Sequence, residues 1–268
     1  MSTFEQAFAD TERAAESAVK AANNLLTVAK QMQKAAQEGN ISNLRRTAER
    51  LTNAAAVARQ EASNVAGAWP FSSDAEEEYL RQSYETEVLS VANSEQLKMY
   101  HRDNRLICFP SVIRVLPSEK SVRIDRKKVP SIRPTKLVTL LKQNQQKPHR
   151  FRSEAFLESL YSVYKTLSDG NQHGMLAGTN RVGTVVALSR IYSMFTSLPG
   201  SNREYDQTDF ARDLYLLDTS GVRKARSGAT VSFPSSTGTR SQRGTFSFVS
   251  PEGEVVTYYG IQFTEANG

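Results

Sequence analysis

The sequence predicts an α+β protein in which helices and strands occupy separate stretches of the chain. Three observations carry this prediction: a heptad spacing of apolar residues near the N-terminus, a proline-containing stretch with alternating apolar residues from Leu106, and three helical patterns followed by three strand patterns after residue 150. We therefore expect a helical hairpin or three-helix bundle over 1–104, a basic β-rich connecting region over 105–150 and a winged-helix-like domain over 151–268.

The first predicted feature is a pair of long helices. Their apolar stripes have the alternating spacing of four and three residues that is typical of a coiled-coil seam. With Thr11 filling one slot, the first stripe is Phe4, Phe8, Ala15, Ala18, Ala22, Leu25, Ala29, Met32 and Ala36, and the second is Ile41, Leu44, Ala48, Leu51, Ala55, Ala58, Ala62 and Val65. Gly39 and Asn40 separate the stripes, and so short a link requires the helices to fold back antiparallel.

Alanine dominates both stripes, which limits the stabilisation that this hairpin gains on folding. Burial contributes about 0.8 kcal/mol per CH₂ group, so an alanine seam contributes far less than a leucine seam. We therefore expect a third helix or a protein partner. Ser73, with Glu76 three residues later, predicts the start of such a helix. Its expected buried stripe is Leu80, Tyr84, Val88 and Val91, with Trp69 closing one end of a bundle; the alternative is a projecting arm that grips another subunit.

The positive charge is concentrated in the middle of the chain. The formal net charge is +6, but 1–104 carries −4 and 153–268 carries −1, whereas 105–152 has 13 Lys or Arg against two acidic residues. So local an asymmetry indicates a surface for phosphate or for an acidic partner.

Within this basic segment the pattern predicts short strands, a loop and then a helix that begins near Pro134. The candidate phosphate-binding residues here are Arg123, Arg126, Lys127, Lys128, Arg133 and Lys136. Aromatic residues are sparse, which disfavours base stacking on single strands and favours backbone contact with duplex nucleic acid.

The last segment has the element order of a winged helix. The expected helical stripes are Phe156, Leu160, Val163 and Leu167, then Val185, Leu188, Ile191, Phe195 and Leu198, then Phe210, Leu214 and Leu217, with Asp206 or Thr208 as the last N-cap. The expected strands are "ATVSFP", "TFSFVS" and "EVVTYYGIQF".

A strand framed by basic residues follows these helices and resembles a wing. The candidate nucleic-acid-binding residues in and beside it are Arg223, Lys224, Arg226, Arg240 and Arg243. The third helix, by contrast, has four aspartates in or next to it (Asp206, Asp209, Asp213 and Asp218) against Arg212, so we expect it to be a poor reader of DNA bases.

No catalytic, metal-binding or cofactor-binding motif is evident. "GTNRVG" (178–183) lacks the lysine that completes a P-loop. The spacing of Asp206, Asp209 and Asp213 could place them around a metal ion, although an acidic first turn of a helix is the simpler interpretation. His101, His149 and His173 have no partner at a telling spacing, and Cys108 reads as an inert core thiol.

The sequence therefore favours a non-enzymatic, nucleic-acid-associating subunit of a multi-protein DNA machine, without cofactor or small-molecule substrate. Duplex nucleic acid is the expected partner, with DNA as the first expectation and structured RNA as the alternative, and a protein partner is expected at the helical hairpin. The alternatives are an assembly adaptor that binds an acidic protein, for example of an ATPase or nuclease complex, and a nuclease with an unrecognised site. The acidic N-terminal stretch is unlike a signal peptide, and the apolar runs are too short to span a bilayer, so a cytoplasmic protein is expected.

Overall fold

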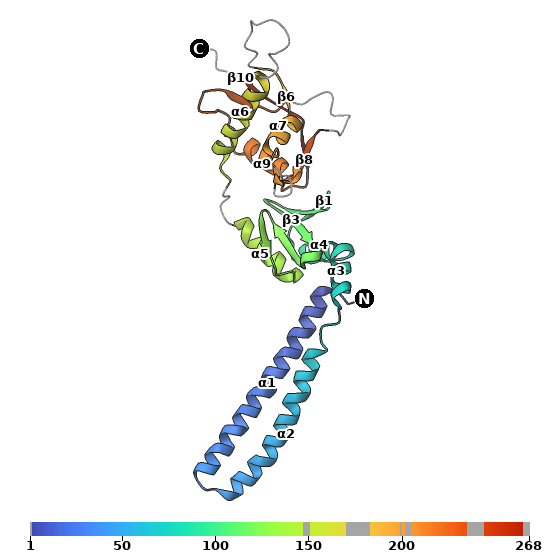
Figure 1. Ribbon diagram of the computed structural model, residues 1–268, viewed down its shortest axis with the longest axis vertical. Helices are drawn as coiled ribbons and strands as arrows, with labels where there is room; N and C mark the ends of the chain where they lie inside the picture. Colours follow the sequence, from blue (N-terminus) through green and yellow to red (C-terminus); the bar gives the residue numbers. More distant parts are fainter. Residues whose placement is uncertain are drawn as a thin grey trace. The chain divides into compact units, whose positions relative to one another are not determined.

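The structure is a computed structural model, and it describes residues 2–146, 151–169, 183–198, 200–201, 205–234 and 244–264. The chain divides into two compact units. Unit 1 comprises Met1–Val91, Pro117–Lys120 and Ser131–Leu137, and unit 2 comprises Ala92–Leu116, Ser121–Pro130 and Val138–Gly268. Helices and sheets are both present and the N-terminal part is a helical pair (Figure 1), which confirms the α+β class.

Unit 1 is built on the antiparallel helices α1 (Phe4–Gln37) and α2 (Ile41–Ala66). The Thr3 side chain accepts a hydrogen bond from the Gln6 backbone N–H at the start of α1. Asn40 does the same for Asn43 at the start of α2. Gly39 has a φ of +68°, a left-handed conformation that glycine adopts without steric cost. The chain therefore reverses direction between α1 and α2 at the predicted position.

The seam between α1 and α2 differs in part from the predicted stripes. Among the predicted positions Phe4 is buried, and the half-buried ones are Phe8, Thr11, Ala15, Ala18, Leu25, Ala29 and Met32 on α1 and Leu44, Ala48, Leu51, Ala58 and Val65 on α2. The alternate positions are shifted by one residue: Ala7, Val28 and Ala35 are buried on α1, and Thr47 and Ala54 on α2. The predicted seam residues Ala22, Ala36, Ile41, Ala55 and Ala62 are exposed instead.

The predicted third helix is two short helices, α3 (Ser73–Gln82) and α4 (Tyr84–Ser94). Ser72, rather than Ser73, caps α3 by accepting a hydrogen bond from the Ala75 backbone N–H. Leu80, Tyr84 and Val88 are fully buried, as expected of the stripe.

An aromatic cluster closes one end of unit 1. Phe4 is fully buried and stacks on Tyr79 with ring centroids 4.4 Å apart. The remaining rings around it are Phe8, Trp69, Phe71 and Tyr84. Trp69, which was predicted to close one end of a bundle, is a member of this cluster.

Unit 2 contains a five-stranded antiparallel sheet in sequential order. Its strands are β1 (Tyr100–Arg102), β2 (Arg105–Cys108), β3 (Ser111–Leu116), β4 (Ser121–Ile124) and β5 (Lys127–Val129), and helix α5 (Pro134–Gln146) follows. Asp103 and Asn104 form the two-residue link between β1 and β2 with φ values of 50° and 56°, the geometry of a tight hairpin turn.

The C-terminal part of unit 2 has helices α6 (Ser153–Asp169), α7 (Leu188–Phe195) and α9 (Gln207–Thr219). The short strand β6 (Val186–Ala187) lies between α6 and α7 and joins a sheet in the order β6-β10-β7, with β7 at Thr230–Ser232 and β10 at Gly260–Thr264. Strands β8 (Phe246–Val249) and β9 (Val255–Tyr258) form a separate hairpin.

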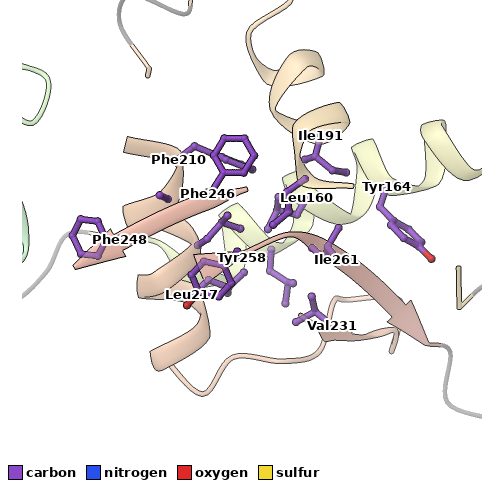
Figure 2. Close-up of a cluster of buried hydrophobic side chains, with 14 of the residues drawn as sticks. Leu160, Tyr164, Ile191, Phe210, Leu217, Val231, Phe246, Phe248, Tyr258 and Ile261 are labelled. Carbon is purple, nitrogen blue, oxygen red and sulfur yellow. The ribbon is translucent and has the colours of Figure 1, made fainter. Parts of the chain in front are cut away.

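These elements enclose one apolar core, shown in Figure 2 with Leu160, Phe210 and Ile261 among its members. Ile107 of β2 and Val112 of β3 belong to the same core, so one face of the five-stranded sheet packs against the C-terminal elements. The predicted strand "EVVTYYGIQF" is divided into β9 and β10. A Cβ atom on Gly260, the first residue of β10, would lie 2.6 Å from Val185 Cγ1, so only glycine fits here without displacing a neighbour.

Candidate nucleic-acid interface

A row of basic residues crosses the five-stranded sheet, with one residue on each strand. Arg102 of β1 pairs with Arg105 of β2, Arg114 of β3 pairs with Arg123 of β4, and Arg123 in turn pairs with Lys128 of β5. Continuing the β2–β3 register by one residue sets Arg105 opposite Arg114. Directly paired residues in an antiparallel sheet project from the same face, so five cations lie side by side.

Like charges at paired positions repel, and carboxylates from the C-terminal elements relieve the repulsion at the centre of the row. Asp206, the N-cap of α9, places one oxygen, Oδ2, 3.1 Å from Arg105 Nη2 and 2.8 Å from Arg114 Nη2. Burial alone would raise the pKa of Asp206, but the Asp209 backbone N–H and Arg105 outweigh that effect and hold the pKa below its ordinary value.

A second cluster of charges surrounds Arg212, which is buried on α9. Its guanidinium lies 2.7 Å from Asp125 Oδ1, 3.0 Å from Asp213 Oδ1 and 3.4 Å from Asp209 Oδ1. Buried charges are tolerated only when they are paired, and here one cation faces three carboxylates. The acidic face of α9 is therefore part of the interior of unit 2, and the aspartates that would repel phosphate are largely covered.

The two clusters meet at a small polar hollow on the sheet. The residues that line it are Arg105, Val112, Arg114, Arg123, Asp125, Asp206 and Asp209. The hollow lies between two parts of the basic row: Arg105 and Arg114, which are paired with Asp206, and Arg123, which is partly buried. Beyond it the row continues toward the exposed side chain of Lys128.

Asp209 is the carboxylate in this region with the most perturbed ionisation. Burial, together with the neighbouring Asp206 and Asp213, raises its pKa to about 6, against the opposing effect of Arg212. Because the folded state holds this proton more tightly than the unfolded state, the group makes unit 2 less stable as the pH rises from about 4 to about 6.

We therefore expect Asp209→Asn to remove a pH dependence of roughly 1–3 kcal/mol in the free energy of unfolding of unit 2. Denaturant unfolding of both proteins at several pH values between about 4 and 7 measures this difference. Asp218→Asn is the matched control, since Asp218 lies on the same helix but pairs with Arg223 and does not belong to this cluster. If the free energy of unfolding depends on pH in the same way for the wild type and Asp209→Asn, the raised pKa of Asp209 is contradicted.

The exposed part of the interface is the hairpin that joins β4 and β5. Arg126, Lys127 and Lys128 are all exposed there. Arg126 also lies over the ring of Tyr205, 4.9 Å from its centroid, a cation–π contact that ties the hairpin to the segment before α9. These residues and Arg123 are the members of the predicted basic segment that the structure brings together.

The other predicted residues lie elsewhere. Arg133 in unit 1 places its Nε 2.8 Å from Glu5 Oε1 and also pairs with Glu12, so it serves the structure of the helical unit; Lys136 is exposed in the same unit. Arg223, Lys224 and Arg226 are exposed on the connection between α9 and β7, where Arg223 pairs with Asp218 at 2.9 Å. Arg240 and Arg243 lie outside the described residues, as do His149, His173 and most of "GTNRVG".

Sequence reasoning missed three members of the row, Arg102, Arg105 and Arg114. Each is separated from the dense cluster "RIDRKK" along the chain, and only strand pairing brings them into line. The sequence did contain one signal that could have identified two of them, namely their positions on either side of a predicted turn. Arg102 and Arg105 flank a two-residue Asp-Asn turn, which fixes them as a cross-strand pair.

We also considered the remaining described residues as nucleophiles and as metal ligands. Burial raises the pKa of the Cys108 thiol to about 12, which makes it a poor nucleophile. Among the residues that the structure describes, His, Cys, Asp and Glu form no group able to hold a metal ion. Within the same residues, the helices are each too short or too polar to cross a membrane.

Comparison with known proteins identifies no relative: neither a protein-family model, nor a curated protein, nor a solved structure matches this chain.

Proposed function

We propose that this chain is a non-enzymatic protein that binds the phosphates of duplex nucleic acid through the five-stranded sheet of unit 2. The observation that carries the proposal is the exposed end of the basic row, where Arg126, Lys127 and Lys128 at the β4–β5 hairpin lie next to the half-buried Arg123; Arg105 and Arg114, at the centre of the row, are already paired with Asp206. Arginine and lysine supply the sequence-independent part of nucleic-acid affinity. A linear array of cations suits a regularly spaced phosphate backbone better than it suits a single small anion.

We further propose that the C-terminal elements form a winged-helix-like arrangement used for packing rather than for reading bases. The order α6, β6, α7, α9, β7 and β10, with the β8–β9 hairpin inserted between β7 and β10, and the sheet order β6-β10-β7 support the comparison. In that arrangement α9 occupies the place of the recognition helix. Its aspartates face Arg105, Arg114 and Arg212 in the same unit, which favours a supporting role for α9.

An assembly adaptor that binds an acidic protein is the second candidate function. The observation that favours it is Asp206, whose one oxygen contacts two arginines of the row. The row thus already accepts a carboxylate from within the chain, and side chains of an acidic partner could engage its exposed end in the same way. In either case, we propose that the chain acts as one subunit of a larger assembly.

The proposal is tested by fluorescence anisotropy with labelled duplexes of unrelated sequence. We expect the triple variant Arg126→Ala/Lys127→Ala/Lys128→Ala to bind all of them about tenfold or more weakly than the wild type. The matched control is Arg45→Ala/Arg46→Ala/Arg50→Ala, which removes the same charge from exposed positions of α2 in unit 1.

Equal reductions of affinity in both variants would mean that only the net charge matters, and the sheet would not be the binding surface. Failure of the wild type to bind any duplex, together with capture of an acidic polypeptide such as poly-glutamate, would replace the nucleic-acid proposal by the adaptor.

A further inference from the structure

Helix α1 carries a second apolar stripe beside the seam that it forms with α2. Its members are Ala15, Val19, Ala22, Leu26 and Ala29, again spaced by four and three residues. Val19 is 59% exposed, Leu26 is 53% exposed and Ala22 is also exposed, whereas Ala15 and Ala29 are half-buried. Isolated exposed apolar side chains are common on protein surfaces, but a heptad-spaced row that spans four turns of one helix is a surface for another helix.

The surface of α1 is also hollowed at the start of this stripe. Glu12, Ala15, Glu16, Val19 and Lys20 line an open hollow. Positions 12, 15, 16 and 19 have the i, i+3, i+4, i+7 spacing of the four residues that receive one side chain in knobs-into-holes packing. The small side chain of Ala15 among these residues lets a partner helix approach closely.

Charged residues flanking the stripe select the occupant. Glu16 and Lys30 are both exposed, and each lies seven residues from Asn23, one before it and one after it. All three therefore have the same heptad position on the same side of the stripe. When two copies of α1 pack antiparallel about Asn23, Glu16 of each copy lies beside Lys30 of the other, whereas parallel packing brings like charges together.

The apolar residues agree with the same two-fold arrangement. Ala15 and Ala29 lie symmetrically about Ala22, and Val19 and Leu26 lie symmetrically about the peptide bond between Ala22 and Asn23. Antiparallel packing about this centre therefore places Val19 of one copy beside Leu26 of the other and alanine beside alanine, so the apolar residues of the two stripes meet one another.

We propose that the stripe Ala15–Val19–Ala22–Leu26–Ala29 binds the same stripe of a second copy of this chain, giving an antiparallel, two-fold symmetric dimer through α1. Self-complementary two-fold contacts are the most common mode of protein self-association. This inference concerns unit 1 alone and does not depend on nucleic-acid binding by unit 2.

Sedimentation velocity of the full chain over a range of concentrations tests the dimer. We expect a reversible monomer–dimer equilibrium, and Leu26→Glu should raise its dissociation constant at least tenfold, because it buries a charge at the interface. Val57→Glu is the matched control: Val57 is 54% exposed on α2, outside the stripe, and its variant should dimerise as the wild type does. Far-UV circular dichroism checks that both variants keep their helices.

Charge reversal tests the orientation. Glu16→Lys alone should weaken the dimer, because it places lysine beside lysine, and Glu16→Lys/Lys30→Glu should restore it, because the exchanged charges again attract. A chain that stays monomeric at every concentration overturns the proposal. A dimer that survives Leu26→Glu, or one that the double variant does not restore, overturns it equally.

Discussion

Replacing Arg212 with methionine should lower the free energy of unfolding of unit 2 by about 3–5 kcal/mol, because it leaves carboxylates buried without their cation. Asp209 and Asp213 each have a side chain that is about one-tenth exposed, and Asp125 contributes a third negative charge. Methionine preserves most of the side-chain volume, so the destabilisation reports charge rather than a cavity. Hydrogen exchange followed on peptides of α9 and the five-stranded sheet measures the change in unit 2 directly.

Arg223→Met is the control for this substitution, since Arg223 also pairs with an aspartate but is 45% exposed. Its cost should stay within about 0.5 kcal/mol. The triple variant Arg212→Met/Asp209→Asn/Asp213→Asn should recover part of the stability, because it removes two of the uncompensated charges along with the cation. If Arg212→Met is as mild as Arg223→Met, the ion cluster does not stabilise unit 2.

Phe4→Ala should be the most damaging single change in unit 1. Phe4 is fully buried at the centre of the aromatic cluster, and truncating a buried phenylalanine costs about 3–5 kcal/mol. The backbone N–H groups of Phe4 and Glu5 also donate to the Glu87 carboxylate, so removal of the ring should loosen the start of α1.

Thermal melts of this variant beside Val57→Ala provide the comparison. Val57 is exposed, and its truncation should change the free energy of unfolding by no more than about 0.5 kcal/mol. Similar melting temperatures for Phe4→Ala and Val57→Ala would show that the aromatic cluster does not hold the helical unit together.

The sequence predicted the mixed helix and sheet content and the position of the turn between the long helices, because these depend on local signals. The glycine at 39, the cap at Asn40 and the cap at Asp206 all act within one turn of a helix. The seam between α1 and α2 was predicted only in part. Alanine doublets at 14–15, 21–22 and 35–36 fit two neighbouring heptad registers equally well, and only the packing of α2 distinguishes them.

The candidate interface could be predicted from the sequence only in small part, because its acidic and basic residues pair with partners that are far away along the chain. Counting charges along α9 suggested an exposed acidic helix that repels phosphate. In the structure Asp206 binds Arg105 and Arg114, which lie about a hundred residues earlier. The basic row depends in the same way on strand register, which local composition does not encode.

The central claim is that the sheet of unit 2 binds phosphates, and the salt dependence of duplex binding tests it most directly. For the wild type we expect log affinity to fall linearly with log salt concentration, with a slope of roughly −0.9 per phosphate that the protein neutralises. Arg126→Ala/Lys127→Ala/Lys128→Ala should reduce the magnitude of that slope by roughly 0.9 for each phosphate that is no longer neutralised, while Arg45→Ala/Arg46→Ala/Arg50→Ala should leave it unchanged. A slope that is the same for the wild type and the sheet variant would contradict the claim.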